Sequence, residues 1–262
     1  MIPRSDLPSR LPELAALVRA AGEAVLAVRA RGFAVETKDD DSPVTAADRQ
    51  AEHILADGLA RIAPGIPVVA EEAAAAGNIP DVSASFWLVD PVDGTKEFVQ
   101  GSGEFTVNVA LVECGRPVLG LVLAPALGRL FTGVAGQGAW VEDAAGRRAI
   151  TTRAVPDAGL TVVGSRWHGD ATAVDAFLAG RRVAERTTVG SSLKLCLLAE
   201  GAADVYPRFG RTMEWDIAAG DAVLRAAGGL VATLDGAPLR YGKPGFENPD
   251  FVAWGRAADA TG

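Results

Sequence analysis

Six short apolar runs between residues 67 and 141 constrain the fold of this chain more than any other feature. Glycine, proline and arginine turns separate them. Closely spaced strands with short connections predict antiparallel pairing within a sheet. The runs are Pro67–Ala70, Phe86–Val89, Phe105–Val112, Pro117–Leu123, Leu130–Val134 and Ala139–Val141.

Two helices are predicted ahead of these runs. From Leu11 to Val28, apolar side chains recur at steps of three and four, which places them on one helical face, and Gly32 fits a helix end. Thr45 can cap the second helix, with Asp48 three residues later as in an acidic capping box, and Pro64-Gly65 ends it.

Strands and helices alternate in the last third of the chain. Paired helices, a large sheet and this alternation predict an α/β (α+β) layered sandwich of alternating helix and sheet layers. We expect residues 1–262 to form a single unit, with helices and a large mostly antiparallel sheet over about 8–150 and an α/β half over about 151–255. The predicted later strands are Leu160–Gly164, 186–189, Asp204–Tyr206 and Leu230–Leu234, and the helices are 170–178, Ser191–Glu200 and Asp216–Ala227.

Composition and charge exclude several classes of protein. The 262 residues are 49% hydrophobic, enough for a sizeable core. The net charge is −8 and no basic run occurs, which argues against a nucleic-acid partner. A small anionic substrate stays compatible with an acidic chain because bound divalent cations dominate the local charge of a site.

The composition and the apolar runs of the sequence also bear on compartment and membrane association. No apolar run approaches the ~18 residues of a membrane span, and the first residues lack the apolar stretch of a signal peptide. We therefore expect a cytoplasmic protein without integral membrane association; nothing basic or amphipathic favours peripheral attachment to the inner membrane face, which stays open. Cys114 and Cys196 show no CxxC spacing and are predicted to be buried free thiols.

Two carboxylates on one tight turn follow the second apolar run. Asp90 ends the run, Pro91 stops the ladder and holds Asp90 extended, and Asp93 comes three residues later. Such a pair can share or bracket Mg²⁺, which prefers oxygen ligands. Gly94 permits close approach of a ligand, a helix start there directs N–H groups at a phosphate, and Thr95 adds a hydroxyl.

Acidic residues stand at two comparable places elsewhere. Glu71-Glu72 follow the first apolar run directly, and Glu214-Trp215-Asp216 precede the last predicted helix. Alone, adjacent glutamates are typical of a solvated surface, and an acid at a helix start is typical of a cap. The repetition of the pattern favours one shared metal site.

The histidines do not favour a side-chain nucleophile. Neither lies in a nucleophile elbow or an HExxH motif. His53 is interpreted as a surface or packing residue of the second helix, and His168 as a loop residue that could alternatively reach a substrate. The acidic run Asp39–Asp41 is interpreted as a solvated loop, with recruitment of a metal as the alternative.

Together these motifs resemble the inositol monophosphatase superfamily, whose members are Mg²⁺-dependent and commonly lithium-sensitive. The resemblance covers about residues 10–255, in the family's order and rough spacing, and implies the layered sandwich of the inositol monophosphatase / sugar phosphatase type. It rests on Pro43–Asp48, Glu71-Glu72, Asp90–Thr95 and Trp215–Gly220.

Further stretches resemble the 3'(2'),5'-bisphosphate nucleotidase branch of this superfamily, the CysQ type. That resemblance implies hydrolysis of adenosine 3',5'-bisphosphate to AMP and phosphate, which clears a by-product of sulfate assimilation. The Ala-rich segment Ala73–Gly77 departs from the branch and leaves the role of that loop in substrate choice open. The matching stretches are Lys38 with Ser42–Thr45, Lys96–Phe98, Gly103–Asn108, Val189–Lys194, Tyr206–Arg208 and Glu214–Asp216.

The resemblance also implies a role for individual residues. It implies two or three Mg²⁺ ions, with Mn²⁺ as a substitute and Li⁺ and Ca²⁺ as inhibitors, and attack by a metal-activated water. Glu71 and Thr95 would position that water, and Asp48 would orient Thr95. The implied metal ligands are the carboxylates of Glu71, Asp90, Asp93 and Asp216 and the carbonyl of Val92. The implied substrate contacts are Glu71, Val92, Asp93, Gly94, Thr95, Gly190, Ser191, Lys194, Arg208 and Asp216.

Lys194 and Arg208 are the candidates for specificity. Lys194, with Gly190–Ser192, begins a predicted helix whose N-terminus could hold a second phosphate. Arg208 could contact a phosphate or stack on adenine. The alternatives are an ordinary Ser-capped helix with an exposed lysine, and a surface arginine.

Three alternative functions remain to be weighed. Inositol monophosphate, a sugar bisphosphate or histidinol phosphate would use the same site. A glycosidase needs its carboxyl groups on opposite sides of a sugar bond, which one turn does not provide. A non-catalytic nucleotide sensor is expected to lack Glu71, Thr95 or Asp48, and all three are present. We expect a small phosphorylated metabolite as partner; homodimers are common in the superfamily, and the sequence leaves the oligomeric state open.

Overall fold

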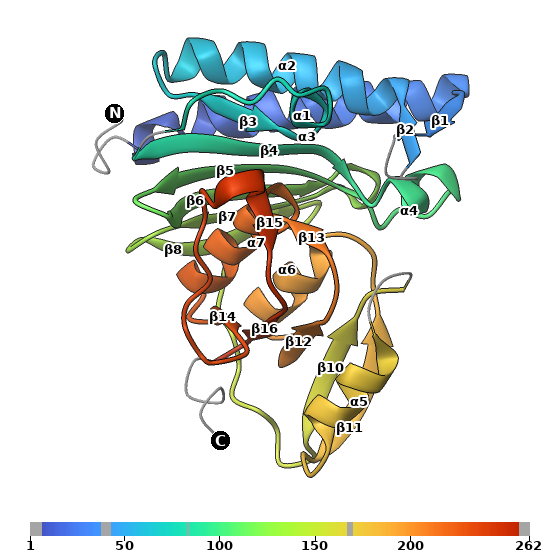
Figure 1. Cartoon of the computed structure of the whole chain (residues 1–262), viewed down its shortest axis with the longest axis vertical. Helices are drawn as coiled ribbons and strands as arrows, with labels where there is room; N and C mark the ends of the chain where they lie inside the picture. Colours follow the sequence, from blue (N-terminus) through green and yellow to red (C-terminus); the bar gives the residue numbers. More distant parts are fainter. Residues whose placement is uncertain (1–6, 38–42, 83, 167–169, 257–262) are drawn as a thin grey trace.

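Helices and sheets alternate in layers in the computed structural model, which describes residues 7–37, 43–82, 84–166 and 170–256 (Figure 1). Helices α1 (Leu7–Arg31) and α2 (Ala46–Ile62) cover one face of a seven-stranded sheet. On its other face, α6 (Leu193–Ala199) and α7 (Glu214–Ala226) separate it from a five-stranded sheet. The predicted layered fold is confirmed.

The seven-stranded sheet contains all six predicted apolar runs. Its order is β3-β4-β5-β6-β7-β8-β9, and every pair is antiparallel except β3 with β4, which is parallel. The mostly antiparallel expectation therefore holds with one exception, and β9 was not predicted because its side chains are mainly polar and exposed. The strands are β3 (Val68–Ala70), β4 (Ser85–Asp93), β5 (Thr106–Glu113), β6 (Arg116–Ala124), β7 (Arg129–Val134), β8 (Gly138–Asp143) and β9 (Gly146–Ile150).

The central strands are buried on both faces. Along β4, Phe86 and Leu88 pack toward α6 and α7, whereas Trp87 and Val89 pack toward α1 and α2. Because both faces are covered, these strands read as continuous apolar runs rather than as alternating patterns.

Helix α7 lies directly against the sheet because two facing positions carry no side chain. A Cβ at Gly120 would lie 2.2 Å from the Ala219 carbonyl oxygen, and one at Gly133 would lie 2.4 Å from Val223 Cα. This close contact fixes the position of the helix that carries Asp216.

The five-stranded sheet has the order β11-β10-β12-β16-β14. Helix α5 (Ala171–Leu178) covers its outer face. Strand β11 begins three residues earlier than predicted, and β16 was not predicted. The strands are β10 (Leu160–Gly164), β11 (Val183–Thr188), β12 (Val205–Arg208), β14 (Leu230–Thr233) and β16 (Phe251–Trp254).

Short elements complete the fold. None of them was predicted except a helix start near Gly94, which is α4. They are the hairpin β1 (Val35–Thr37) and β2 (Pro43–Thr45), α3 (Glu71–Ala75), α4 (Thr95–Val99), the 3-10 turns η2 (Pro125–Leu127) and η3 (Pro244–Phe246), and the pair β13 (Thr212–Met213) and β15 (Glu247–Asn248).

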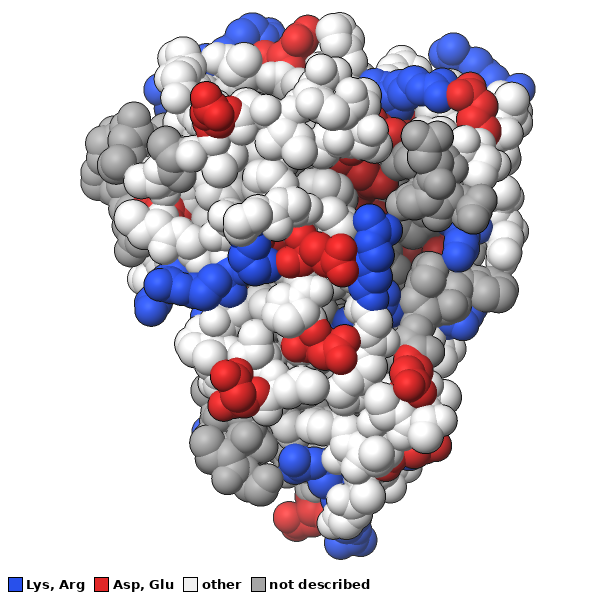
Figure 2. Space-filling view, in the orientation of Figure 1, with Lys and Arg blue, Asp and Glu red and all other residues white. Residues whose placement is uncertain are grey.

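Several smaller expectations can be compared with the structure. Both cysteines are free, but only Cys196 is buried; Cys114 is exposed on the turn between β5 and β6, so its predicted burial was wrong. None of the helices among the described residues is long and apolar enough to cross a membrane. The coloured residues in Figure 2 intersperse acidic and basic groups without a broad basic patch on that face. The division near residue 150 stays a prediction.

Candidate active site

A cavity of about 1360 Å³ lies where the ends of β3 and β4 meet the first turns of α6 and α7. It is lined by most of the residues for which the sequence implied a role. Asp48 and Gly190 are not part of the lining. The implied residues that line it are Glu71, Asp90, Val92, Asp93, Gly94, Thr95, Ser191, Lys194, Arg208 and Asp216.

A bulge in β4 places two carboxylates at the end of the strand. Asp90 pairs with Asn108 and Asp93 with Thr106, so three steps along β4 match two along β5. Because Pro91 has no N–H, the ladder is interrupted there and then resumes. The expectation that Pro91 stops the ladder holds only locally, because pairing resumes at Asp93. Within the bulge, Val92 N–H donates to Asp90 Oδ1 at 3.0 Å.

Asp93 is held by groups from two distant segments. The Ser192 N–H donates to Asp93 Oδ2, and the Thr106 hydroxyl and the Asn108 amide lie 3.4 and 3.3 Å from the same oxygen. The Ser192 hydroxyl donates to Asn108 Oδ1 at 2.8 Å and so fixes the orientation of that amide. Sequence analysis assigned no role to Thr106 and Asn108, and it placed Ser192 only at a helix start that could hold a phosphate.

Glu71 is the first residue of α3, a five-residue helix whose start is held from α2. Glu52 accepts hydrogen bonds from Glu72 N–H at 2.7 Å and Ala73 N–H at 2.9 Å. Burial raises the pKa of Glu52 to about 7. Sequence reasoning missed Glu52, although it lies one helical turn after Asp48 on α2 and therefore on the same face.

The acids of the cavity raise one another's pKa. Burial is the main cause of a pKa well above the ordinary value at both Asp90 and Asp216. Glu71 and Asp93 add to it at each, and at Asp90 so does Asp216. At Asp93, burial raises the pKa and Lys194 opposes it. Negative charge is therefore concentrated in a desolvated region, which favours binding of a cation.

The donor set fits a hard divalent cation. Carboxylate oxygens and the buried Val92 carbonyl are the ligand types that Mg²⁺ prefers. No three acids among the described residues converge on a single point. One oxygen each of Asp90, Asp93 and Asp216 accepts from a backbone N–H group, as Asp216 Oδ2 does from Met213 N–H at 2.9 Å. The carboxyl groups of Asp90 and Glu71 also share a hydrogen bond. Side-chain rotations would be needed to complete a coordination shell.

Asp48 and Thr95 meet at the edge of this acidic group. The Thr45 N–H and hydroxyl both donate to Asp48 Oδ2 at 2.8 Å, which completes the predicted capping box of α2. The Thr95 hydroxyl lies 3.1 Å from the Val92 carbonyl and 3.5 Å from Asp48 Oδ1, with both oxygens able to accept its proton. Burial and the nearby Glu71 raise the pKa of Asp48.

Lys194 is buried, so the alternative of an exposed lysine was wrong. Its Nζ donates to Ser191 O at 2.6 Å and Val189 O at 3.3 Å, and lies 5.4 Å from the centre of the Tyr206 ring. Burial lowers the pKa of Lys194 to about 8, although attraction to Asp93 opposes that shift.

Arg208 is also buried, so the surface alternative was wrong here too. Its Nη2 donates to Arg211 O at 2.7 Å, while its buried Nε has no partner among the described residues. The turn before α6 is less open than expected, because Gly190 N–H donates to Glu104 and Ser192 N–H to Asp93. The implied substrate contact of Gly190 stays a prediction.

The remaining sequence candidates lie at or beyond the border of the site. His53 is exposed, as interpreted, and lies 3.4 Å from Asp57. Lys38, the acidic run Asp39–Asp41 and His168 lie outside the described residues.

Comparison with known proteins identifies the relatives of this fold and site. The family model for the inositol monophosphatase family matches residues 9–259. A Shigella flexneri protein named 3'(2'),5'-bisphosphate nucleotidase CysQ is 44% identical over 245 residues, which are 92% of this chain and 98% of that protein.

Two solved structures are similar over nearly the whole chain. CysQ from Bacteroides thetaiotaomicron, described as a bacterial member of the inositol monophosphatase family, has a TM-score of 0.79 and 33% identity, covering 94% of this chain and 97% of that one. An inositol monophosphatase from Anabaena (Nostoc) has a TM-score of 0.78 and 25% identity, covering 98% and 94%.

Proposed function

This chain belongs to the inositol monophosphatase family, and we propose that it is a Mg²⁺-dependent 3'(2'),5'-bisphosphate nucleotidase that converts adenosine 3',5'-bisphosphate to AMP and phosphate. The chain is a phosphoric monoester hydrolase. The observation that carries the proposed metal dependence is the group of mutually repelling carboxylates in the cavity, of which Asp90 is buried and Glu71, Asp93 and Asp216 are half-buried. We expect this enzyme to act in the cytoplasm.

The cations would be held by five residues at the meeting point of β4, α3 and α7. These are Glu71, Asp90, Asp93 and Asp216 through carboxylates and Val92 through its carbonyl. When bound, such cations lower the pKa of an attacking water and neutralise charge on the phosphate and on the leaving oxygen.

Thr95, Glu71 and Asp48 would orient the attacking water. The Thr95 hydroxyl donates a hydrogen bond to Val92 O or Asp48, so its lone pairs are left to accept a hydrogen bond from the water. The Glu71 carboxylate is the second acceptor for that water. Asp48, held by Thr45, keeps the threonine in this orientation.

Backbone N–H groups would bind the phosphate being removed. Gly94 has φ +86° and lets the chain turn from β4 into α4, where Phe98 N–H makes the first helical bond to Gly94 O. The N–H groups of Gly94 and Thr95 precede that bond and have no partner within the helix, so they suit phosphate oxygens. The N–H of Asp93, at the end of β4, would complete the phosphate contacts.

Lys194 and Arg208 would bind the second phosphate of the substrate. Both are buried cations that line the cavity, and the Arg208 Nε lacks a partner among the described residues. A buried donor without a partner is costly unless a ligand satisfies it. A cavity of about 1360 Å³ also has room for more than a phosphate group.

The test compares Mg²⁺-dependent phosphate release from four substrates. They are adenosine 3',5'-bisphosphate, adenosine 3'-monophosphate, inositol 1-phosphate and fructose 1,6-bisphosphate. We expect kcat/KM to favour the bisphosphate over the inositol and sugar phosphates by about two orders of magnitude, roughly 2.7 kcal/mol, with the 5'-phosphate retained in the product.

Each contrary result has a distinct meaning. Equal or better turnover of inositol 1-phosphate would overturn the nucleotidase assignment and keep the site chemistry. Equal turnover of adenosine 3'-monophosphate would remove the proposed role of the second phosphate. Release from none of the four would contradict the proposed activity.

A further inference from the structure

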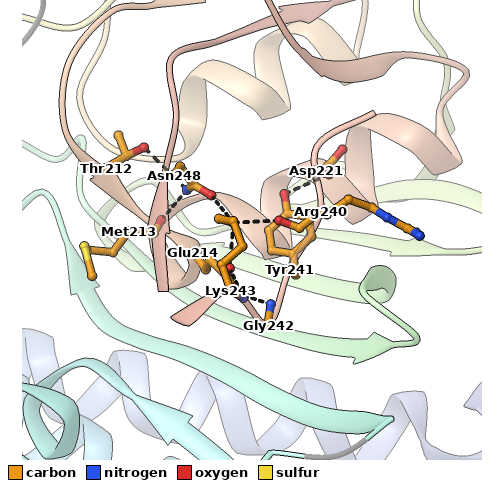
Figure 3. A network of polar contacts seen from close by, with 9 residues as sticks. All are labelled: Thr212, Met213, Glu214, Asp221, Arg240, Tyr241, Gly242, Lys243 and Asn248. Atoms are coloured by element: carbon orange, nitrogen blue, oxygen red, sulfur yellow. Dashed lines mark hydrogen bonds and ion pairs between the residues drawn. The ribbon is translucent and has the colours of Figure 1, made fainter. Parts of the chain in front are cut away.

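The first turn of α7 is fastened to residues 240–248 by partly buried polar contacts that the proposed chemistry does not use (Figure 3). Glu214, the first residue of α7, is 0% exposed. Its carboxylate accepts hydrogen bonds from Gly242 N–H at 2.6 Å, Lys243 N–H at 2.9 Å and Lys243 Nζ at 2.6 Å.

The same lysine continues the contacts to β15. Lys243 Nζ donates to Arg240 O at 2.6 Å and to Asn248 Oδ1 at 3.1 Å. Asn248, which is 5% exposed, donates through Nδ2 to Met213 O at 2.9 Å. We call Glu214, Lys243 and Asn248 the Glu214 network.

Met213 connects this network to the proposed metal ligand Asp216. Its carbonyl is held by Asn248, and its N–H donates to Asp216 Oδ2 at 2.9 Å. Met213 also lines the cavity, as does Gly245 of the fastened segment. A single residue, Met213, therefore connects Asn248 on β15 to Asp216 on α7.

Small displacements of a ligand matter at such a site. Productive geometry must be held within a fraction of an ångström, and groups behind the ligands commonly set that precision. In the ion pair here, the Glu214 carboxylate is buried and the Lys243 side chain is 28% exposed. Such a pair adds little net stability by itself, and in some proteins it fixes one arrangement. Both carboxylate oxygens of Glu214 accept hydrogen bonds, which fits a role in fixing the position of the first turn of α7.

We propose that the Glu214 network positions Asp216, through Met213, for binding a divalent cation. Glu214, Lys243 and Asn248 are positioning residues in this inference, since none of them lines the cavity. The inference rests on the proposed function, because it presupposes a cation at Asp216.

Asn248→Asp tests the connection with little change in shape. The variant keeps an oxygen for Lys243 and loses the amide donor to the Met213 carbonyl. Titration calorimetry without substrate is expected to show Mg²⁺ binding weakened at least tenfold, and turnover should require correspondingly more Mg²⁺. KM for the nucleotide at saturating Mg²⁺ should stay within twofold. Lys243→Met, which removes the same network at another point, is expected to weaken Mg²⁺ binding in the same direction and serves if Asn248→Asp does not fold.

Tyr241→Phe is the matched control. It removes a buried hydrogen bond of 2.8 Å from the same segment to the same helix, at Asp221, and keeps the aromatic ring that lies 5.6 Å from Lys243 Nζ. We expect a lower melting temperature and Mg²⁺ binding within twofold of the unsubstituted protein.

Two results would overturn the inference alone. Unchanged Mg²⁺ affinity in folded Asn248→Asp or Lys243→Met would show that the network does not position Asp216. Equal weakening in Tyr241→Phe would show general loosening of α7 instead. If the unsubstituted protein binds no divalent cation, the proposed metal site itself is wrong and this inference falls with it.

Discussion

Helix α7 carries two aspartates in opposite electrostatic surroundings, the buried Asp221 and the half-buried Asp216. At Asp221, burial raises the pKa, while Arg225 Nε at 2.7 Å and the Tyr241 hydroxyl at 2.8 Å oppose that shift. At Asp216, burial also raises the pKa, but Asp93 and Glu71 reinforce the shift, and Arg208 opposes it only in part. The two aspartates thus differ in the sign of the charge around them.

The difference separates a structural from a functional carboxylate. A buried charge that the fold itself neutralises contributes to one specific packing arrangement. A buried charge surrounded by like charges costs stability unless a ligand supplies the opposite charge. The acids at the N-terminal end of α7 therefore indicate a bound cation, and Asp221 does not.

Removing a carboxylate from the acidic end should give the largest effect on activity. Asp93→Asn is expected to lower kcat/KM by about 10³-fold, roughly 4 kcal/mol of transition-state stabilisation. In the presence of a chelator its melting temperature should equal or exceed that of the unsubstituted protein, because one repelling charge is gone. Steady-state assays and thermal unfolding check both parts. A kcat/KM within tenfold of the unsubstituted protein would contradict a functional role for the acids at this end of α7.

Removing the neutralised carboxylate, Asp221, should lower stability and leave activity nearly unchanged. Asp221→Asn leaves Arg225 without its ion-pair partner and is expected to cost about 3 kcal/mol of unfolding free energy. Turnover per folded molecule at saturating Mg²⁺ should stay within twofold. Urea unfolding and assays on the same sample measure the two quantities. A stability equal to that of the unsubstituted protein would contradict the structural role assigned to Asp221.

The smallest predicted effect concerns Lys194. This buried cation lies beside the repelling acids of the cavity and could neutralise one of them. Burial lowers its pKa from 10.5 to about 8. The lysine therefore loses its charge above about pH 8, and kcat/KM for the bisphosphate should fall about tenfold between pH 8 and pH 9.5. Because the unfolded state still binds this proton up to its higher pKa, the contribution of Lys194 to folding stability rises with pH over the same interval.

Two comparisons decide what this lysine does. Lys194→Met should remove the alkaline decline in pH profiles of kcat/KM. Adenosine 3'-monophosphate should show a weaker decline than the bisphosphate if Lys194 binds the second phosphate. Equal declines for both substrates would instead assign Lys194 to neutralising Asp93, as Arg225 does for Asp221.

Much of the fold was readable from local pattern. Each apolar run from Val68 to Val141 became a strand, and Thr45 with Asp48 capped α2 as predicted. These features depend on neighbouring residues along the chain, which the sequence displays directly. The bulge after Asp90 was misjudged because pairing resumes on a partner strand that the local pattern does not show.

The acids of the site were likewise visible from the sequence, but their support was not. Glu71, Asp90, Asp93 and Asp216 stand out because each is at the end of a strand or the start of a helix. Glu52 and Asn248 gave no comparable signal, since each acts through a backbone group of another segment. The roles of all these residues in binding metal stay predictions for the experiments above.

The sequence by itself determined the layered fold class and the cluster of acids at the element ends. Only the tertiary structure decided which distant groups each of these carboxylates meets. Glu214 finds Lys243 29 residues away, and Asp93 finds the Ser192 amide 99 residues away. Local pattern restricts the backbone over a few residues, whereas the field at a buried carboxylate depends on whichever distant groups the packed layers bring beside it.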